Sequence, residues 1–407
     1  MRASRLSRVT MPAVAALLFY GILTLWVPAR WALSSWQVGI FALAFVWAVN
    51  LAARPFPLGW HPAMALAILP PAWGLIQLAT GHTVYRWATA NSILDWAADA
   101  ALFFLTFQFA GHDTLRRRFL NAVLYFGCAL SVVSTIQMFT SGGKIFWIFP
   151  SGYTSFVLGP FVYENQYSAF IELILPLALF RAISQPRQAL RYWLMVSAMA
   201  ASVAAAASRA GGILVLAEVL AGILLAWRRG PDRRSLAWGV AQFAALAVAF
   251  TAVVGWDNMW SRFQRADQLG VRREILLSSL QMIREKPAMG FGLGAWPTVY
   301  PAHALYDIGK FMNQAHNDWA QWAVEGGLPL AAVMLLFAVM LFRPAVRSLW
   351  GLGLIAVLIH CCVDYPMQQR PALGGFVFAF AGVLLASRSA APGAVLRPYS
   401  IARYTHV

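Results

Sequence analysis

The chain has 407 residues, of which 60 % are hydrophobic and 11 % are charged, and its net charge is +16. A water-soluble globular protein has about 45–50 % apolar and about 25 % charged residues, so the composition excludes that class. Arginine-rich cytoplasmic loops of a membrane protein account for the positive charge, and we therefore expect no nucleic-acid partner.

Apolar windows of about 20 residues, the length that crosses a bilayer as a helix, recur along the chain. The predicted spans lie near residues 11–28, 35–53, 61–80, 92–110, 119–139, 162–182, 190–207, 210–227, 236–255, 317–342, 349–366 and 370–388. The first follows the basic segment MRASRLSR, and we interpret it as a transmembrane helix rather than a cleaved signal peptide. The sequence thus predicts an all-α polytopic membrane protein with about 12 transmembrane helices.

The basic residues predict which way this bundle faces. With the N-terminus in the cytoplasm, 19 of the 31 Lys and Arg residues fall in cytoplasmic segments and five in short external loops. An excess of positive charge in short loops marks the cytoplasmic face. We therefore expect both termini in the cytoplasm and one long external loop, residues 256–315, which holds the other seven basic residues.

The long external loop is predicted to be partly helical. Leu276, Leu280 and Ile283 recur at helical spacing, and Pro287 ends the pattern. The sequence GFGLGAW follows, with Gly292 as the second of its three glycines. Alternate glycines let backbone amides approach a ligand closely, although no strand precedes them as a nucleotide fold would require.

Two polar clusters interrupt the apolar pattern before this loop. The sixth span opens with Tyr163 and Asn165 in GPFVYENQYSAF, which is more polar than a helix cap requires. Arg209 lies in the short turn ASRAGG, close to the bilayer surface. Its side chain could anchor there by snorkelling, or its planar fork could grip two phosphate oxygens. Both clusters are candidates for substrate binding.

Two further clusters lie in and after the long loop. Arg272 and Arg273 open the predicted helix and could bind phosphate or, with Arg262 and Arg265, acidic lipid headgroups. The tenth span begins with His316, Asn317 and Asp318, and Glu325 follows two turns later on nearly the same face. Helix capping explains Asn317 and Asp318 but not His316, whose imidazole can exchange a proton near neutral pH.

Together these groups combine cations that suit a diphosphate with one imidazole that suits general-base work. The sequence contains no Asp-x-Asp pair and no His/Cys cluster with metal-ligand spacing, and Cys128, Cys361 and Cys362 form no CxxC pair. We therefore expect a reaction without a bound metal or other cofactor, with arginines neutralising the leaving phosphate.

The motifs, in their order along the chain, resemble those of the O-antigen ligase/polymerase superfamily. The matching stretches are GPFVYENQYSA, SRAG, the R-x-x-I that starts at Arg272, MIREKPAMGFGLGAW, HNDWAQWAVEGGLPL and the later VDYPMQQRPALGG. Leu276 departs from the aromatic residue that many relatives carry. The resemblance covers residue 159 to the last span, so we expect an N-terminal helical region (1–158), a ligase-like core (159–388) and a basic cytoplasmic tail (389–407).

The resemblance implies an enzyme of the bacterial inner membrane that works at the periplasmic face. Such enzymes move a glycan from undecaprenyl diphosphate to an acceptor hydroxyl, which in ligases belongs to a lipid A–core sugar. By this resemblance His316 is the base, and Arg209 with Arg272 or Arg273 holds the diphosphate. Tyr163, Asn165, Gly292, Asn317, Asp318 and Glu325 would then bind substrate or support the site, and no oligomeric state is implied.

Other functions remain open at this stage. Polysaccharide polymerases and protein O-oligosaccharyltransferases use the same donor and differ in the acceptor. A lipid or solute transporter would place polar groups across the membrane depth, as Asp95, Asp99, Glu172 and Glu218 could do. A non-catalytic scaffold for envelope assembly would leave the SRAG and HN motifs unexplained.

Overall fold

The structure, a computed structural model, describes residues 4–53, 58–152, 157–228, 233–254, 268–306, 309, 311–368 and 373–389. Regular structure in these ranges is almost entirely helical, which confirms the all-α class. The sheet found there is one antiparallel pair, β1 (Lys144–Ile145) and β2 (Phe149–Pro150). The predicted basic tail beyond residue 389, and Arg262 and Arg265, lie outside the described residues.

Nine helices in the described ranges are long and apolar enough to cross a membrane, which confirms the polytopic class. They are α1 (Arg5–Leu23), α2 (Arg30–Ala53), α3 (Ala63–Thr80), α4 (Arg86–Ala110), α5 (Asp113–Thr140), α6 (Glu164–Ser184), α7 (Ala189–Ala206, preceded by the 3-10 turn η1, Pro186–Gln188), α8 (Arg209–Arg228) and α13 (Asp318–Arg347). Each overlaps one predicted span.

The other three predicted spans contain helices that are not among these nine. They are α9 (Arg233–Val254), α14 (Leu352–His360) and α15 (Leu373–Ser389). The nine residues of α14 extend about 14 Å, which is less than half the thickness of a hydrocarbon core of about 30 Å. The eleventh predicted span, 349–366, is therefore helical over a much shorter range, because the chain turns after His360 and enters the short 3-10 helix η3 (Pro366–Gln368).

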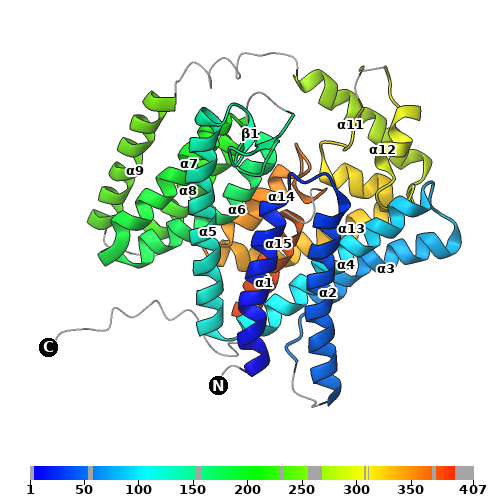
Figure 1. The fold of residues 1–407 in the computed structure, drawn as a ribbon, viewed down its shortest axis with the longest axis horizontal. Coiled ribbons are helices and arrows are strands. Elements are labelled where there is room, and N and C mark those ends of the chain that lie inside the picture. The colour runs from blue at the N-terminus through cyan, green and yellow to red at the C-terminus, as the bar shows by residue number, and fades with distance from the viewer. Residues whose placement is uncertain are drawn as a thin grey trace.

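The long loop predicted to be external is partly helical, as expected. It contains α11 (Gln268–Glu285), α12 (Trp296–Val299) and the 3-10 turn η2 (Tyr300–Ala302), at the upper right of Figure 1. The apolar face of α11 is rotated from the predicted one: Ile275 and Met282 are buried, whereas Leu276 and Leu280 are partly exposed. The reason is that Glu274 is buried between Tyr300 and Ser278, which bond its carboxylate and fix that face inward.

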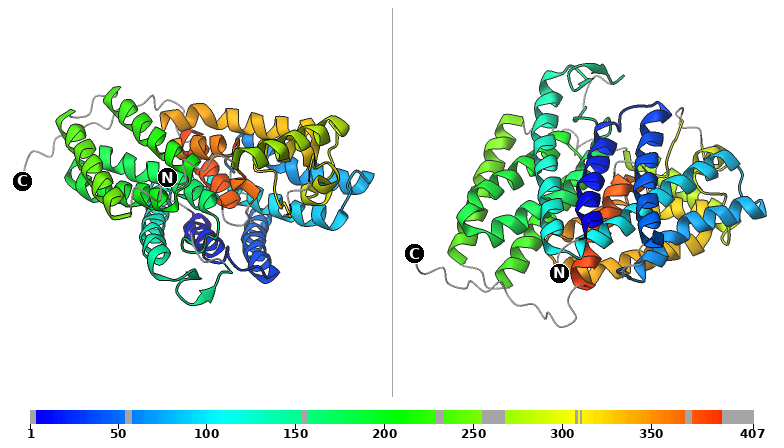
Figure 2. Two further views of the ribbon diagram at one scale, coloured as in Figure 1. Left: turned by 90° about the horizontal axis from the view of Figure 1, so that it is seen from above. Right: turned by 60° about the horizontal axis from the view of Figure 1, so that its bottom comes forward.

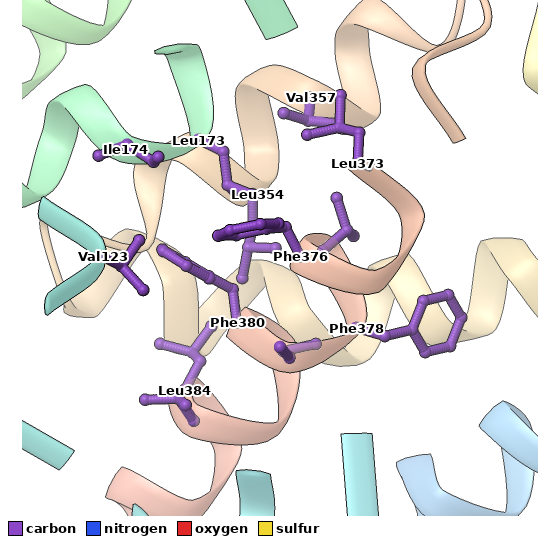
Figure 3. Packing of buried hydrophobic residues seen from close by; sticks show 14 of the residues in the cluster. Val123, Leu173, Ile174, Leu354, Val357, Leu373, Phe376, Phe378, Phe380 and Leu384 are labelled. Carbon is purple, nitrogen blue, oxygen red and sulfur yellow. The ribbon is translucent and has the colours of Figure 1, made fainter. Parts of the chain in front are cut away.

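The core joins the N-terminal helices to the C-terminal ones. α15 lies at the centre of the bundle and packs along α4, while α3 packs against both α4 and α13 (Figures 1 and 2). Figure 3 shows Phe376 and Phe380 of α15 between Leu354 of α14 and Val123 of α5. This apolar interior holds α6 and α14 in place, and their ends carry the residues described next.

Candidate active site

Segments that are distant in the sequence meet at one end of the bundle. They are the starts of α6, α8 and α13, the start of α11, and the turn that follows α14. Hydrogen bonds between their side chains, rather than apolar packing alone, hold these ends together. The longest of these connections in sequence joins Tyr163 to Asp364, 201 residues apart.

Asp364 lies at the centre of this cluster and is 1 % exposed. Its Oδ2 accepts hydrogen bonds from the Tyr163 hydroxyl at 2.7 Å, from Arg272 Nη2 at 3.1 Å and from the Asn165 amide. Its Oδ1 accepts from the backbone N–H of Tyr365 and lies 3.5 Å from His316 Nδ1. A buried carboxylate needs such partners, and Asp364 has them from four segments of the chain.

The charges around Asp364 favour its ionised form. Burial alone would raise the pKa of this carboxyl, but the adjacent His316 ring and Arg272 guanidinium outweigh burial and lower the pKa below its usual value. Burial and the Asp364 charge raise the pKa of Tyr163, so its hydroxyl stays protonated and donates. The cluster therefore holds a fixed negative charge between an arginine and a histidine.

His316 is held in an unusual backbone conformation beside Asp364. Its φ is +50°, in the left-handed region that few residues other than glycine adopt. The preceding Ala315 N–H donates to Gln321 Oε1 at 2.9 Å, which fixes the chain from one side. The ring meets Tyr365 edge-on at 4.8 Å between centroids, and Tyr365 stacks on Tyr163 at 5.4 Å. Strain of this kind persists where surrounding contacts enforce it, often at functional sites.

Asn165 links the cluster to the SRAG turn. Ser208 donates to Asn165 Oδ1 at 2.7 Å, which leaves the amide N–H groups to donate to Tyr163 and Asp364. Ser208 Oγ in turn accepts the backbone N–H of Gly211 at 3.1 Å. The next residue, Arg209, begins α8 and is partly buried. The turn therefore brings the backbone of Arg209 to the edge of the cluster.

The two neighbouring arginines of α11 differ in their surroundings. Arg272 donates to Val363 O, Tyr163 and Asp364, and its side chain is 30 % exposed. Arg273 is exposed. The structure thus includes Arg272 in the Asp364 cluster.

Asn317 and Asp318 fasten the start of α13 to the turn that carries Asp364. The Asn317 side chain caps the helix by accepting from the N–H of Ala320, and it also donates to Cys362 O at 2.8 Å. The N–H of Asp318 donates to Cys361 O at 2.9 Å, and its carboxylate accepts from the N–H of Met367. Asp318 is fully buried, so it is placed to support the site rather than to contact a ligand directly, whereas Asn317 is half-buried.

Gly292 and Glu325 belong to a separate junction. Glu325 accepts from the N–H of Gly292 through its carbonyl and from the N–H of Gly294 through its carboxylate. Gln77 of α3 donates to Glu325 O and Met289 O and accepts from the N–H of Leu293. These contacts occupy the amides of the glycine-rich turn, so we interpret it as a structural connection between α3 and α13, whose backbone departs from helical geometry at Gly327.

Replacing Gly292 by alanine is expected to destabilise this junction by about 1–3 kcal/mol. Its φ is +107°, and a Cβ atom there would lie 2.3 Å from Thr83 Oγ1. Thermal unfolding of the purified protein in detergent measures the effect. Gly111→Ala is the control, because a Cβ there meets only a carbonyl oxygen at 4.0 Å. Equal unfolding temperatures for the two variants would contradict the proposed junction.

Reasoning from the sequence did not nominate Asp364, Ser208 or Gln77 as individual residues. The first two lie in stretches that carry the family resemblance, VDYPMQQRP and SRAG. A signal for Asp364 was present, because a single acid directly after an apolar segment is costly near a membrane and usually functional. No sequence pattern marks Gln77, whose partners lie more than 200 residues away.

Comparison with known protein families gives a match to the family described as O-antigen ligase, over residues 194–335. The matched region contains Arg209, Arg272, Gly292, His316 and Glu325, whereas Tyr163, Asn165 and Asp364 lie outside it. A search of curated proteins finds no match. The O-antigen ligase family implies ligase- or polymerase-type glycan transfer between a lipid-linked glycan and a glycan acceptor. The match, over residues 194–335, confirms the resemblance of this chain to the O-antigen ligase/polymerase superfamily.

Proposed function

We propose that this protein is an O-antigen ligase-like glycosyltransferase. It moves a glycan from undecaprenyl diphosphate to a hydroxyl of a lipid A–core sugar at the periplasmic face of the inner membrane. The convergence of His316, Arg272 and Asp364 at one end of the bundle is the main support. A base, a cation and an orienting carboxylate are the groups that such a transfer needs.

In the proposed reaction the acceptor oxygen attacks the anomeric carbon of the donor glycan. His316 takes the hydroxyl proton as the new C–O bond forms. The bond from the anomeric carbon to the diphosphate oxygen breaks on the opposite face, and the electron pair leaves with the lipid diphosphate. The configuration at that carbon is therefore inverted. With Nδ1 facing Asp364, Nε2 is the ring nitrogen that accepts the proton.

The arginines would neutralise the diphosphate as it leaves. A guanidinium has five N–H donors in a planar fork, and contacts among the described residues use only part of the Arg272 fork. The remaining donors and its partial exposure suit a phosphate oxygen. Arg209 at the start of α8 would supply a second cation to the same donor. The contact with Asp364 would keep Arg272 oriented before the donor binds.

The two adjacent arginines provide a matched pair of variants. Arg272→Ala is expected to lower kcat/KM for the lipid-linked donor at least about tenfold, because charge-assisted hydrogen bonds are each worth about 1.5–3 kcal/mol. Arg273→Ala removes the same charge from an exposed position and is expected to stay within about threefold of the unmodified protein. Steady-state kinetics with purified protein measure both. Equal losses would indicate a general basic surface instead of a specific contact.

The direction of the helices supports a periplasmic site. In a twelve-pass arrangement with a cytoplasmic N-terminus, the sixth, eighth and tenth spans begin outside and the eleventh ends outside. The starts of α6, α8 and α13 and the end of α14 occupy those places, and they carry the cluster. Arg181 and Arg228 lie at the opposite ends of α6 and α8, as expected for the cytoplasmic side.

Deleting the gene and separating the envelope glycans on a gel tests this function. Loss of long chains from lipid A–core, with accumulation of lipid-linked polymer, is the expected result. Retention of a single repeat on lipid A–core would indicate a polymerase, and loss of glycan from proteins an O-oligosaccharyltransferase. Unchanged glycans would contradict all three. A transporter would then be favoured, if essential positions extend along the membrane depth through Asp95 and Glu218.

A further inference from the structure

A second polar contact lies beneath the Asp364 cluster, and the proposed reaction does not use it. His360 Nδ1 of α14 contacts both carboxylate oxygens of Glu172 on α6, at 2.9 and 3.0 Å. Both side chains are fully buried. Glu218 of α8 is also buried and lies close enough to Glu172 to interact with it electrostatically. Buried ionisable pairs are costly, and apolar residues of similar size often replace them without loss of stability.

The positions of Glu172 and His360 connect them to Asp364. The N–H of Asp364 donates to the carbonyl oxygen of His360 at 3.0 Å, so the imidazole lies at the base of the turn that carries the carboxylate. On α6, Glu172 follows Asn165 by seven residues, which is about two helical turns on nearly the same face. Asn165 itself bonds Asp364. The start of α6 and the end of α14 are thus joined twice, by the contact of Asn165 with Asp364 and by that of Glu172 with His360.

Two attachment points restrict a turn more than one does. The upper contacts of Asp364 with Tyr163 and Asn165 alone would let the turn after α14 pivot about them. The lower contact lies on the last turn of α14, and Gly353 on the first turn brings the other end of that helix against the backbone of α6 at Glu172. Fixing both levels sets the direction in which the Asp364 carboxylate faces His316.

We propose that Glu172 and His360 are positioning residues that hold the Asp364 carboxylate in its orientation toward His316. This inference rests on the proposed glycan transfer, because Asp364 matters for catalysis only if His316 acts as the base. The pair does not contact the substrate. Its removal should therefore lower activity only through Asp364.

The test replaces both partners so that no buried charge is left alone. Glu172→Leu/His360→Leu is expected to retain its unfolding temperature in detergent while kcat for glycan transfer falls at least about tenfold. Glu172→Gln, whose amide oxygen can still accept from the imidazole, is expected to keep kcat within about threefold. If the double leucine variant does not accumulate, Glu172→Gln/His360→Leu also lacks the contact and carries the same expectation of reduced kcat.

A double-mutant cycle separates positioning from a merely structural role. In an Asp364→Asn background the leucine pair should cause no further loss, because residues that act as one unit have non-additive effects. Thr10→Val is the control, since it removes a buried hydrogen bond to Trp47 in another part of the bundle and should leave kcat unchanged. Additive losses, or wild-type kcat in the leucine pair, would overturn the inference. Undiminished transfer by Asp364→Asn alone would instead contradict the proposed site.

Discussion

Replacing His316 with alanine is expected to lower glycan transfer about 1,000-fold, within the range that positioned general bases contribute. The acceptor hydroxyl would then have no group to take its proton as the new bond forms. His316 Nδ1 lies 3.5 Å from Asp364 Oδ1, and the ring is edge-on to Tyr365. The measurement is the initial rate of transfer from a lipid-linked glycan to lipid A–core by purified protein.

Two further variants make this result interpretable. His316→Asn tolerates the left-handed backbone at this position but cannot act as a base, so its rate should be as low as that of the alanine variant. His303→Ala removes a histidine of the same loop that pairs with Glu285, outside the Asp364 cluster, and should keep near-normal activity. Substantial transfer by His316→Asn would show that the imidazole does not carry the proton.

Replacing Asp364 with asparagine is expected to lower kcat at least about 100-fold, since an orienting carboxylate beside a catalytic imidazole has effects of this order or larger. The amide has nearly the same shape as the carboxyl group but no negative charge. Arg272 would lose its ionic partner, and the imidazolium that forms during the reaction would lose its stabilising charge. Kinetic constants for donor and acceptor, measured on the purified variant, test this expectation.

Asp113→Asn is the matched control for this substitution. Asp113 forms a surface ion pair with Arg116 and its side chain is 66 % exposed, so the same chemical change should leave transfer within about threefold of normal. An Asp364→Asn variant with normal kcat would show that the buried carboxylate serves only to hold the helix ends together. If the variant has a lower unfolding temperature, its kcat is calculated per folded molecule, so that reduced stability is not mistaken for reduced catalysis.

The helical, polytopic class could be predicted from the sequence because the bilayer imposes it. A span must satisfy its backbone hydrogen bonds internally and must be about 20 residues long, so long apolar runs predict helices directly. The eleventh segment shows the limit of this reasoning. Its apolar run continues past His360, but the N–H of Asp318 bonds the carbonyl of Cys361, and the chain turns there. That contact depends on a residue of another helix, which the local pattern does not reveal.

Residues of the candidate site could be predicted from the sequence where their side chains are chemically unusual for their position. His316 and Arg272 stand out because ionisable groups at a membrane surface need a reason, and the structure brings both to Asp364. The alternate glycines around Gly292 suggest a ligand-binding turn, yet the N–H of Gly292 bonds the Glu325 carbonyl, and the N–H of Gly294 bonds the Glu325 carboxylate. Which amides are already occupied depends on tertiary contacts such as those of Gln77.

The central claim is that the cluster of His316, Arg272 and Asp364 transfers glycan from a lipid diphosphate. The most direct measurement is a transfer assay with purified protein, a labelled undecaprenyl-diphosphate glycan and lipid A–core, in which both products are quantified. We predict that the unmodified protein forms labelled lipid A–core glycan and undecaprenyl diphosphate in equal amounts, and that His316→Ala and Asp364→Asn form neither at a comparable rate. Transfer at the normal rate by both variants would contradict this assignment of the site.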